Sequence, residues 1–343
     1  MTKQPVQSDF LNPSPDLNGA SVLITGGTGS LGKSLAKVLL GRFKLRRLVI
    51  FSRDELKQSE MASELSINSN PDPRFFIGDV RDRDRLEMAM RDIDIVIHAA
   101  APKQVPTAEY NPFECINTNI LGAENVVQSA IRCGVGRVIA LSTDKAANPI
   151  NLYGASKLAS DKIFVAANNL SGENGTRFAN VRYGNVIGSR GSVMPFFQKL
   201  IADNAKSLPI TDPRMTRFWI TLEQGINFIL SSLAMMKGGE IFVPKIPSMK
   251  ISDMAEAIAP GIPHHTVGIR PGEKLHEIMI TFDDARSTFE LDDRYIIAPQ
   301  FHFWSDEDYA VKGARMVDEG FSYASDTNNE WLDGETLRSM VSE

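Results

Sequence analysis

Two ionisable side chains four residues apart could form a proton-transfer pair. Tyr153 and Lys157 stand in the run NLYGASK, and this spacing places both side chains on one face of a helix. A nearby ammonium group lowers the pKa of a phenol, so Tyr153 could take a hydroxyl proton near neutral pH. The spacing also fits an ordinary pair on a helix surface. Its position shortly after a predicted strand favours the catalytic interpretation.

That strand ends in a second polar run, Ser142-Thr143-Asp144-Lys145. A hydroxyl group here would hold a substrate oxygen, which is all that a simple alcohol dehydrogenase needs. The carboxyl and amino groups of Asp144 and Lys145 add a proton donor and a proton acceptor, which suit elimination of water next to a ketone. An Asp–Lys pair that closes a surface loop is the alternative. The carboxyl end of a central strand is where such sheets place their active sites, so we favour catalysis.

A glycine-rich turn connects the first predicted strand to the first predicted helix. The run TGGTGSLG places glycines at positions 26, 27, 29 and 32, which satisfies the GxGxxG pattern. Missing side chains permit a tight turn and let backbone N–H groups reach a pyrophosphate at the positive helix end. The pattern alone is weak, but as the first turn of a long alternating series it predicts a dinucleotide site. The residues expected to bind the cofactor here are Gly26, Thr28, Gly29, Ser30, Leu31 and Gly32.

The end of the second strand should lie beside the adenosine ribose. An acidic residue directly at that point would bind the ribose hydroxyls of NAD. Ser52 and Arg53 come first instead, and Lys57 follows one turn later, which favours the 2′-phosphate of NADP. The alternative is a charged helix start in which Asp54 serves NAD.

Later strand ends supply smaller or polar residues. Asp79 and Val80 are expected to meet the adenine, and Ala99 and Ala100 are small enough to let the cofactor lie close. His98 could equally be a core histidine, and we assign it no catalytic role.

The elements that position these residues alternate regularly. Apolar runs at 20–25, 48–51, 74–77, 93–99 and 137–141 predict strands, and helical spacing occurs at 30–40 and 119–133. Continuous apolar strands separated by helices favour a parallel sheet that is covered on both faces. The predicted class is therefore α/β, a Rossmann-like doubly wound parallel sheet with a smaller C-terminal substrate-binding region.

The chain is expected to divide into three parts. Residues 1–18 are predicted to form a flexible arm, and residues 19–185 a Rossmann domain that binds NADP. Residues 186–343, rich in Gly, Pro and Arg loops, should be mainly a substrate-binding region and C-terminal tail. A helix and a strand within 222–245 are expected to return to the first sheet.

Composition excludes several classes of protein. The chain has 343 residues, with 37 Lys and Arg against 42 Asp and Glu. This net negative charge argues against a general nucleic-acid-binding protein. Cys115 and Cys133 support neither a disulfide framework nor a zinc finger, and the pair His264-His265 has no further ligands nearby, so no metal is expected. No signal peptide or membrane-length apolar run is visible. We therefore expect a cytoplasmic protein without membrane or nucleic-acid partners.

Together these residues resemble the extended short-chain dehydrogenase/reductase superfamily. More narrowly, the chain is similar to the inverting UDP-N-acetylglucosamine 4,6-dehydratases that begin pseudaminic acid synthesis. Tyr153 supports the inverting type, because retaining relatives usually carry a methionine there. Pro102, Gln104 and Thr107 depart from the family pattern. The stretches that carry the resemblance include TGGTGSLGK, SRDELKQSEM, FIGDVRDRDRL, STDKAANPINLYGASK, VRYGNVIGSRGSVMPFF, MTRFWIT, EIFVPKIPSMK and GIRPGEKLHEIMI.

The resemblance implies a reaction. Tightly bound NADP would oxidise the sugar at C4 and return the hydride to C6, with Tyr153 as base and Thr143 holding the oxygen. Lys145 would remove the C5 proton while Asp144 protonates the departing C6 hydroxyl. Lys157 would orient the nicotinamide ribose. The product would be UDP-2-acetamido-2,6-dideoxy-β-L-arabino-hex-4-ulose. Because related proteins usually form homo-oligomers, the resemblance also implies a homo-oligomer.

The second half contains three arginines in loops that match the family motifs. Arginine forks suit a diphosphate and a glutamate suits ribose hydroxyls, although any single arginine could be a surface residue. The predicted substrate-binding residues are Lys103, which should also contact the cofactor, Asn185, Val186, Arg190, Arg217, Arg270 and Glu273.

Other functions remain possible on the same fold. A nucleotide-sugar C4 epimerase or simple reductase would make Asp144 and Lys145 dispensable. A non-catalytic NADP-binding regulator would not need Tyr153, Lys157 or the Thr143-Asp144-Lys145 run. The same inverting dehydration could also serve capsule or lipopolysaccharide sugars.

Overall fold

The computed structural model describes residues 8–65, 71–189, 192–301, 303–304, 309 and 313–342. Its centre is a parallel sheet of six strands, of which all but the outer strand β3 are mostly buried, as the apolar runs predict. These strands are β1 (Ser21–Thr25), β2 (Arg47–Ser52), β3 (Arg74–Ile77), β4 (Ile95–His98), β5 (Arg137–Thr143) and β6 (Arg177–Tyr183). Their order, β3-β2-β1-β4-β5-β6, is that of a doubly wound dinucleotide-binding sheet, so the predicted fold class is confirmed.

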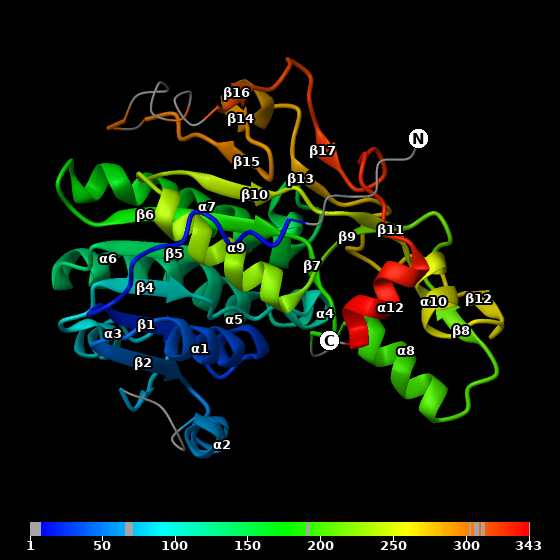
Figure 1. The fold of residues 1–343 in the computed structure, drawn as a ribbon, viewed down its shortest axis with the longest axis horizontal. Coiled ribbons are helices and arrows are strands. Elements are labelled where there is room, and N and C mark those ends of the chain that lie inside the picture. Colours follow the sequence, from blue (N-terminus) through cyan, green and yellow to red (C-terminus); the bar gives the residue numbers. More distant parts are fainter. Residues whose placement is uncertain are drawn as a thin grey trace.

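Helices cover both faces of this sheet (Figure 1). Helices α1 and α9 pack together on one face, and α3, α6 and α7 pack together on the other. Two separate apolar cores result, one on each side of the sheet. The helices of the first half are α1 (Ser30–Arg42), α2 (Glu55–Leu65), α3 (Arg83–Met90), α4 (Val105–Tyr110), α5 (Pro112–Ile116), α6 (Gly122–Cys133) and α7 (Leu152–Ser171). The π-helix η1 (Asn117–Leu121) leads into α6, and the short 3-10 helix η2 (Asp144–Ala146) follows β5.

The second half returns to the sheet more extensively than its sequence predicts. Strand β10 (Ile241–Pro244) pairs with β6, and the chain then adds β14 (Thr288–Glu290), β15 (Arg294–Ile297) and β16 (Arg315–Met316). The pairs β10–β15, β15–β14 and β14–β16 are antiparallel. Helix α9 (Leu222–Met235) begins with a capping box between Thr221 and Gln224. Segment 222–245 thus contributes α9 and β10, and three more strands extend the same sheet.

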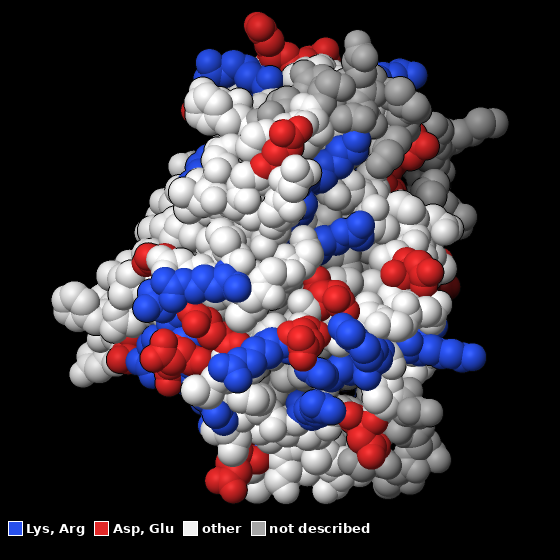
Figure 2. Space-filling view, turned by 90° about the vertical axis from the view of Figure 1, so that its left-hand side faces the viewer, with Lys and Arg blue, Asp and Glu red and all other residues white. Residues whose placement is uncertain are grey.

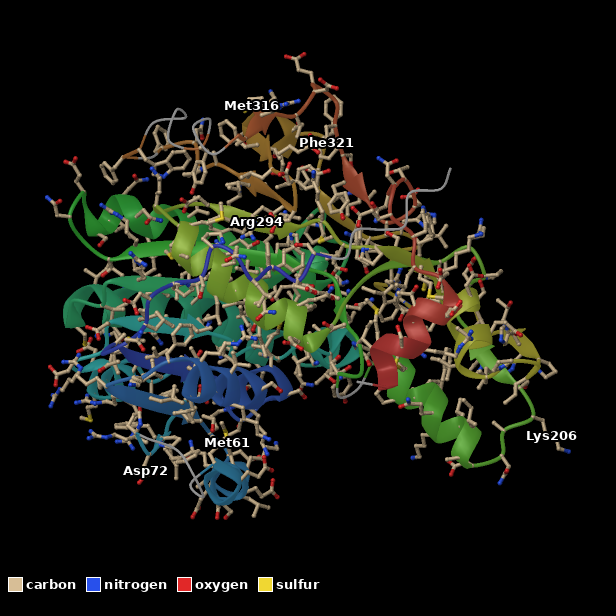
Figure 3. The ribbon with its side chains drawn as sticks, viewed as in Figure 1. Met61, Asp72, Lys206, Arg294, Met316 and Phe321 are labelled. Atoms are coloured by element: carbon tan, nitrogen blue, oxygen red, sulfur yellow. The ribbon has the colours of Figure 1, made fainter. Side chains whose placement is uncertain are left out.

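The remainder of the second half forms a smaller lobe beside the sheet (Figure 1). It has its own apolar core, which includes Met194, Phe197, Trp219, Met254 and Leu337. Lys206, labelled in Figure 3, lies near the outer edge of this lobe. The lobe contains α8 (Val193–Ala202), α10 (Ile251–Ile258), α12 (Gly334–Ser342), β8 (Leu208–Ile210), β9 (Thr216–Ile220), β11 (Ser248–Lys250) and β12 (His264–Thr266). Three further elements, β7 (Asn185–Val186), β13 (Ile278–Ile280) and β17 (Tyr323–Ala324), lie where the lobe and the sheet adjoin.

The expectation of a flexible arm is wrong for the part of residues 1–18 that the structure describes. Phe10 and Leu17 are buried, and Phe10 packs edge-on against Phe228 of α9 with ring centroids 5.0 Å apart. Asn227 and Ser231 of the same helix donate hydrogen bonds to the carbonyls of Asp9 and Asn12. Two apolar anchors and paired backbone groups fix this segment, although its polar composition suggested mobility.

Candidate active site

The glycine turn between β1 and α1 has the shape that a dinucleotide needs. Gly26 adopts a left-handed φ of 65°, and a Cβ atom on it would lie 2.8 Å from the backbone of Ala100. A Cβ on Gly32 would lie 2.5 Å from the carbonyl oxygen of Gly27. Helix α1 opens at Gly29, which has no side chain to cap it, and the first N–H groups of a helix have no partner within the helix. The turn therefore offers an anion-binding helix end, with Thr28, Ser30 and Leu31 between the glycines.

The predicted adenosine side of the turn is charged, with its cations already paired to acids. Arg53 lies 3.6 Å from Asp79, and Lys57 lies 2.7 Å from Asp54. Asp54 accepts a hydrogen bond from the Lys57 N–H at the start of α2, so it serves the helix as well. Ser52 is buried, and its hydroxyl accepts a hydrogen bond from Gln58.

Asp79 and Val80 follow β3 and lie close to these charges. Burial alone raises the pKa of Asp79, but hydrogen bonds from Arg81 outweigh it and hold that pKa below its usual value. Arg81 donates to Asp79 through Nε and a terminal nitrogen at 3.0 and 2.7 Å. Val80 is buried against Gly122, where a Cβ would touch it. Arg81 was absent from the sequence prediction because its charge is unremarkable in the run RDRDR.

The residues after β4 approach the glycine turn as expected. The Thr25 hydroxyl accepts hydrogen bonds from the N–H groups of Ala99 and Ala100 at 3.2 and 3.3 Å. It also contacts Nδ1 of His98 at 2.8 Å. Burial and the nearby Lys157 lower the pKa of His98 to about 3, so this histidine is neutral and structural. Lys103 is exposed in the following loop.

The chemical centre lies at the carboxyl end of β5. Asp144 is fully buried in η2, and its Oδ1 accepts hydrogen bonds from the Thr143 hydroxyl at 2.8 Å and from Lys145 Nζ at 3.0 Å. Thr143 and Lys145 are only partly buried, so they are the members of the run that a ligand can reach. Among the described residues, Asp144 Oδ2 has no hydrogen-bond partner. The Oδ1 atom of Asp144 is therefore hydrogen-bonded to both of the residues that a ligand can reach.

Helix α7 brings Tyr153 and Lys157 to this centre. Its first turn is capped by Asn151, whose side-chain oxygen accepts the Gly154 N–H at 2.7 Å. Lys157 is buried and donates to the carbonyl of Leu141 on β5 at 2.6 Å. Burial lowers its pKa below the ordinary lysine value.

The expected low pKa of Tyr153 is wrong for the chain as it stands. Burial raises the pKa of Tyr153 to about 12, and the positive charge of Lys145 and contact with Thr143 only partly oppose this. Lys157 does not provide the expected effect, because its ammonium is directed at a backbone carbonyl of β5. The spacing correctly predicted that the two side chains share a helix face, but not their environment.

Lys145 also holds its proton strongly. Burial favours the neutral amine, but the carboxylates of Asp144 and Glu277 outweigh burial and raise the pKa of Lys145 well above its ordinary value. Glu277 lies 3.3 Å from Lys145 Nζ. It was missed by the sequence prediction. A charge directly before the apolar strand β13 was a signal, but the sequence could not show which residue it would face.

Arg217 on β9 contacts Glu277 as well, although Arg217 was predicted to lie in a loop. Its Nε lies 3.7 Å from Glu277, and its terminal nitrogens donate to the carbonyls of Thr216, Lys274 and Leu275. The guanidinium is therefore already hydrogen-bonded to its own chain. A role in binding a diphosphate remains a prediction for Arg217.

The other predicted substrate-binding residues lie at several places around this centre. Asn185 and Val186 form β7, which pairs with β9. Arg270 and Glu273 lie 3.8 Å apart in a loop, and the carbonyl of Gly272 between them accepts a hydrogen bond from Asn151 at 2.7 Å. This bond ties the loop to the first turn of α7. Arg190 lies outside the described residues.

The described part of the chain contains neither a metal-binding cluster nor a membrane-spanning helix. No group of three or more His, Cys, Asp or Glu residues there could hold a metal ion. None of the helices in that part is long and apolar enough to span a bilayer.

Known proteins are similar to this chain in sequence and in fold. The family described as polysaccharide biosynthesis protein matches residues 22–299. An inverting UDP-N-acetylglucosamine 4,6-dehydratase from Campylobacter jejuni is 58% identical over 329 residues, covering 94% of this chain and 98% of the relative. A UDP-glucose 4-epimerase from Rickettsia canadensis is 40% identical over 308 residues, which cover 87% of this chain and 88% of the relative. The solved structure of Pen from Bacillus thuringiensis aligns with a TM-score of 0.86 at 36% identity, over 95% of this chain and 98% of the other.

The fold, the glycine turn and the Tyr–Lys helix define an extended short-chain dehydrogenase/reductase. Within that class, the chain belongs to the polysaccharide biosynthesis protein family. The resemblance to inverting dehydratases is confirmed by the Campylobacter relative.

Proposed function

We propose that this protein is a UDP-N-acetylglucosamine 4,6-dehydratase that inverts C5. The observation that carries the proposal is the ion pair between Asp144 Oδ1 and Lys145 Nζ, which lie 3.0 Å apart beside Thr143 and Tyr153. A C4 epimerase has no use for this acid–amine pair, whereas loss of water between C5 and C6 needs a proton acceptor and a proton donor. The 58% identity to an inverting dehydratase over nearly the whole chain supports the same assignment.

The glycine turn fits a nicotinamide dinucleotide, since side chains at positions 26 and 32 would collide with backbone. Gly26, Gly29 and Gly32 would hold the pyrophosphate, and Ser52, Arg53 and Lys57 would hold a 2′-phosphate, which favours NADP over NAD. When bound, NADP supplies the acceptor and donor for the hydride that leaves C4 and returns to C6. Lys157 would contact the nicotinamide ribose.

Different residues of the chain carry out the separate proton transfers. Tyr153, once ionised, takes the proton of the C4 hydroxyl, and the Thr143 hydroxyl holds that oxygen. Lys145 as the neutral amine removes the C5 proton, which the adjacent C4 ketone makes acidic. Asp144, in its protonated form, supplies the proton to the departing C6 hydroxyl and is left as the carboxylate; the Thr143 hydroxyl bonded to its Oδ1 links it to the substrate side.

The smaller lobe would hold the nucleotide. Arg217, Arg270 and Arg190 would face the diphosphate and Glu273 the ribose, with Lys103, Asn185 and Val186 beside the sugar. We further propose that the protein is a cytoplasmic homo-oligomer and that its product, UDP-2-acetamido-2,6-dideoxy-β-L-arabino-hex-4-ulose, enters pseudaminic acid synthesis. Capsule or lipopolysaccharide sugars are the alternative destination.

Incubation with UDP-N-acetylglucosamine in deuterated water tests the activity. The expected product has lost one water, carries deuterium and inverted configuration at C5, and forms without net consumption of coenzyme. Nucleotide released from the denatured protein is expected to be NADP. A C4 epimer that keeps its C6 hydroxyl would establish the epimerase alternative, which the Rickettsia relative makes worth testing.

Replacement of the central amine gives a sharper prediction. Lys145→Ala should lower turnover by about 100-fold or more while cofactor stays bound, because the C5 proton loses its acceptor. Lys162→Ala, at an exposed position on the same helix as Tyr153, is the matched control and should retain full turnover. Loss of bound cofactor in Lys145→Ala would show a structural role instead.

A further inference from the structure

A buried carboxylate from the second half of the chain contacts the proposed catalytic amine. Glu277 is 2% exposed and stands directly before β13. Its Oε1 lies 3.3 Å from Lys145 Nζ, while Lys145 itself belongs to η2 of the first half. Burial of an unpaired carboxylate is costly, so charge compensation must hold Glu277 in this place.

Three cations surround this carboxylate, but they differ in accessibility. Lys145, Arg217 and Lys274 lie 3.3, 3.7 and 3.9 Å from Glu277. The Lys145 side chain is 23% exposed, whereas those of Arg217 and Lys274 are each 9% exposed. Arg217 and Lys274 also donate hydrogen bonds to backbone carbonyls, so they are anchored. Lys145 is therefore the cation of the three that is best placed to meet a ligand.

The backbone of Glu277 is fixed from two directions. Its N–H donates to the Ser325 hydroxyl at 2.9 Å, and its carbonyl accepts the Ser325 N–H at 2.8 Å. The Ser325 hydroxyl in turn contacts the Thr216 hydroxyl at 2.7 Å. Ser325 follows β17 and Thr216 begins β9, so the backbone of Glu277 is bonded to one segment that is itself bonded to a second. The backbone position from which the carboxylate reaches Lys145 is therefore fixed.

We propose that Glu277 is a positioning residue for Lys145, which holds the amino group beside Asp144 and sets the pH at which it can accept the C5 proton. This inference rests on the proposed function, in which Lys145 removes that proton. The step itself moves one proton. The neutral amine becomes an ammonium, and the electron pair of the C5–H bond stays on C5, conjugated with the C4 ketone.

The charged groups that face Lys145 determine the direction of the pH effect. Asp144 in η2 and Glu277 before β13 favour the ammonium, and Arg217 on β9 and Lys274 in the preceding loop oppose it. Tyr153 on α7 is neutral below its raised pKa. Loss of the Glu277 charge removes one of two stabilising carboxylates while both opposing cations remain. The amine should then become available at lower pH.

The experiment compares pH–rate profiles of the intact protein and its Glu277→Gln variant. The substrate is UDP-N-acetylglucosamine, and the readout is the acid limb of kcat/KM together with the rate of deuterium incorporation at C5. We expect the acid limb of the variant to move down by about one pH unit or more. Turnover at the optimum should fall by about 10- to 100-fold, because the amine is no longer fixed.

Two further variants make the result decisive. Glu277→Asp keeps the charge but shortens the reach, so its acid limb should stay in place while turnover falls; this variant also serves if Glu277→Gln does not fold. Glu290→Gln is the control, because Glu290 lies in another part of the molecule, where its carboxylate is 2.7 Å from Lys245. This variant should leave the pH–rate profile and the turnover unchanged. An unshifted acid limb in a folded Glu277→Gln variant, or full turnover in Glu277→Asp, overturns the inference.

Failure of the inference and failure of the proposed function give different results. If the unsubstituted protein does not dehydrate the substrate or incorporate deuterium at C5, the proposed function fails. If the unsubstituted protein does both and the Glu277 variants behave as it does, only the role of Glu277 fails.

Discussion

Tyr153 and Lys145 both hold their protons more tightly than the same groups do in water, for different reasons. Burial is the main cause for Tyr153, whose pKa rises to about 12. For Lys145 the carboxylates of Asp144 and Glu277 overcome an opposing effect of burial. At neutral pH the site therefore holds a phenol and an ammonium. In the proposed mechanism each must lose its proton before it can act as a base, so neighbours that change its proton affinity should change the rate.

His98 shows a residue-level effect on stability rather than on catalysis. Its folded-state pKa of about 3 lies below the ordinary value of 6.5, so the unfolded chain binds the proton more readily. The stability that His98 contributes is fully present above pH 6.5 and is lost as the pH falls toward 3. We expect its share of the loss to be on the order of 1 kcal/mol near pH 5.5.

Chemical denaturation of the protein and of a His98→Asn variant, each at a pH above 6.5 and near pH 5.5, measures that share. Asparagine can keep the hydrogen bond to Thr25 but does not titrate. The variant should therefore lose less free energy of unfolding on acidification than the unsubstituted protein. Equal losses would mean that His98 does not contribute.

At the scale of elements, the contact between α7 and η2 aligns the two halves of the proposed catalytic centre. Gly154, in the first turn of α7, faces the backbone carbonyl of Lys145, and a Cβ there would collide with it. The neighbouring Asn151 caps α7 and also binds the carbonyl of Gly272. The start of α7 therefore contacts both the Thr143-Asp144-Lys145 run and a loop of the second half.

Gly154→Ala should disrupt this alignment. The added methyl group must push η2 away from α7, which displaces Lys145 relative to Tyr153. We expect turnover to fall by about 100-fold and stability to fall by about 1–3 kcal/mol. Steady-state kinetics and chemical denaturation would measure the two effects.

Gly41→Ala in α1 is the matched control. This glycine is exposed, a Cβ would meet nothing within 4 Å, and alanine favours a helix, so stability should rise slightly with unchanged turnover. If Gly154→Ala behaved in the same way, the close contact between α7 and η2 would not matter for catalysis.

At the scale of the whole molecule, the N-terminal segment crosses α9 and joins distant parts of the chain. Arg294 of β15, labelled in Figure 3, donates to the Ser231 hydroxyl at 2.8 Å, and its guanidinium lies 4.9 Å from the ring centre of Phe228. Phe10 packs against the same ring. Residues from the beginning, middle and end of the sequence thus share one core. The side of the molecule away from the smaller lobe instead carries basic and acidic side chains intermixed (Figure 2).

Phe10→Ala tests how much this segment contributes. Phe10 is 3% exposed, so its truncation should lower the free energy of unfolding by about 3–5 kcal/mol. Activity of the folded variant should persist, because the proposed catalytic residues lie elsewhere. Leu11→Ala, at a position that is 49% exposed, should change stability by less than about 0.5 kcal/mol. Equal stability of the two variants would show that the packing of Phe10 is unimportant.

Much of the first half could be predicted because its signals are local. The apolar run at 74–77 coincides with β3, and the run at 137–141 forms most of β5. The glycine turn and the Tyr153–Lys157 spacing likewise depend on residues that are close in sequence. The short strands β14 and β16 were not predicted, because two or three residues carry too little periodicity and are stabilised by pairing with β15.

The sequence by itself determined the doubly wound class of the fold, the glycine turn and the chemical identity of the Thr143-Asp144-Lys145 run. Strand periodicity, backbone freedom of glycine and side-chain chemistry are all properties of short segments. Only the tertiary structure decided that Glu277 meets Lys145, that Tyr153 is buried, and that Phe10 and Leu17 are packed. Burial and charge–charge interaction depend on distances in space, and these join residues separated by more than a hundred positions.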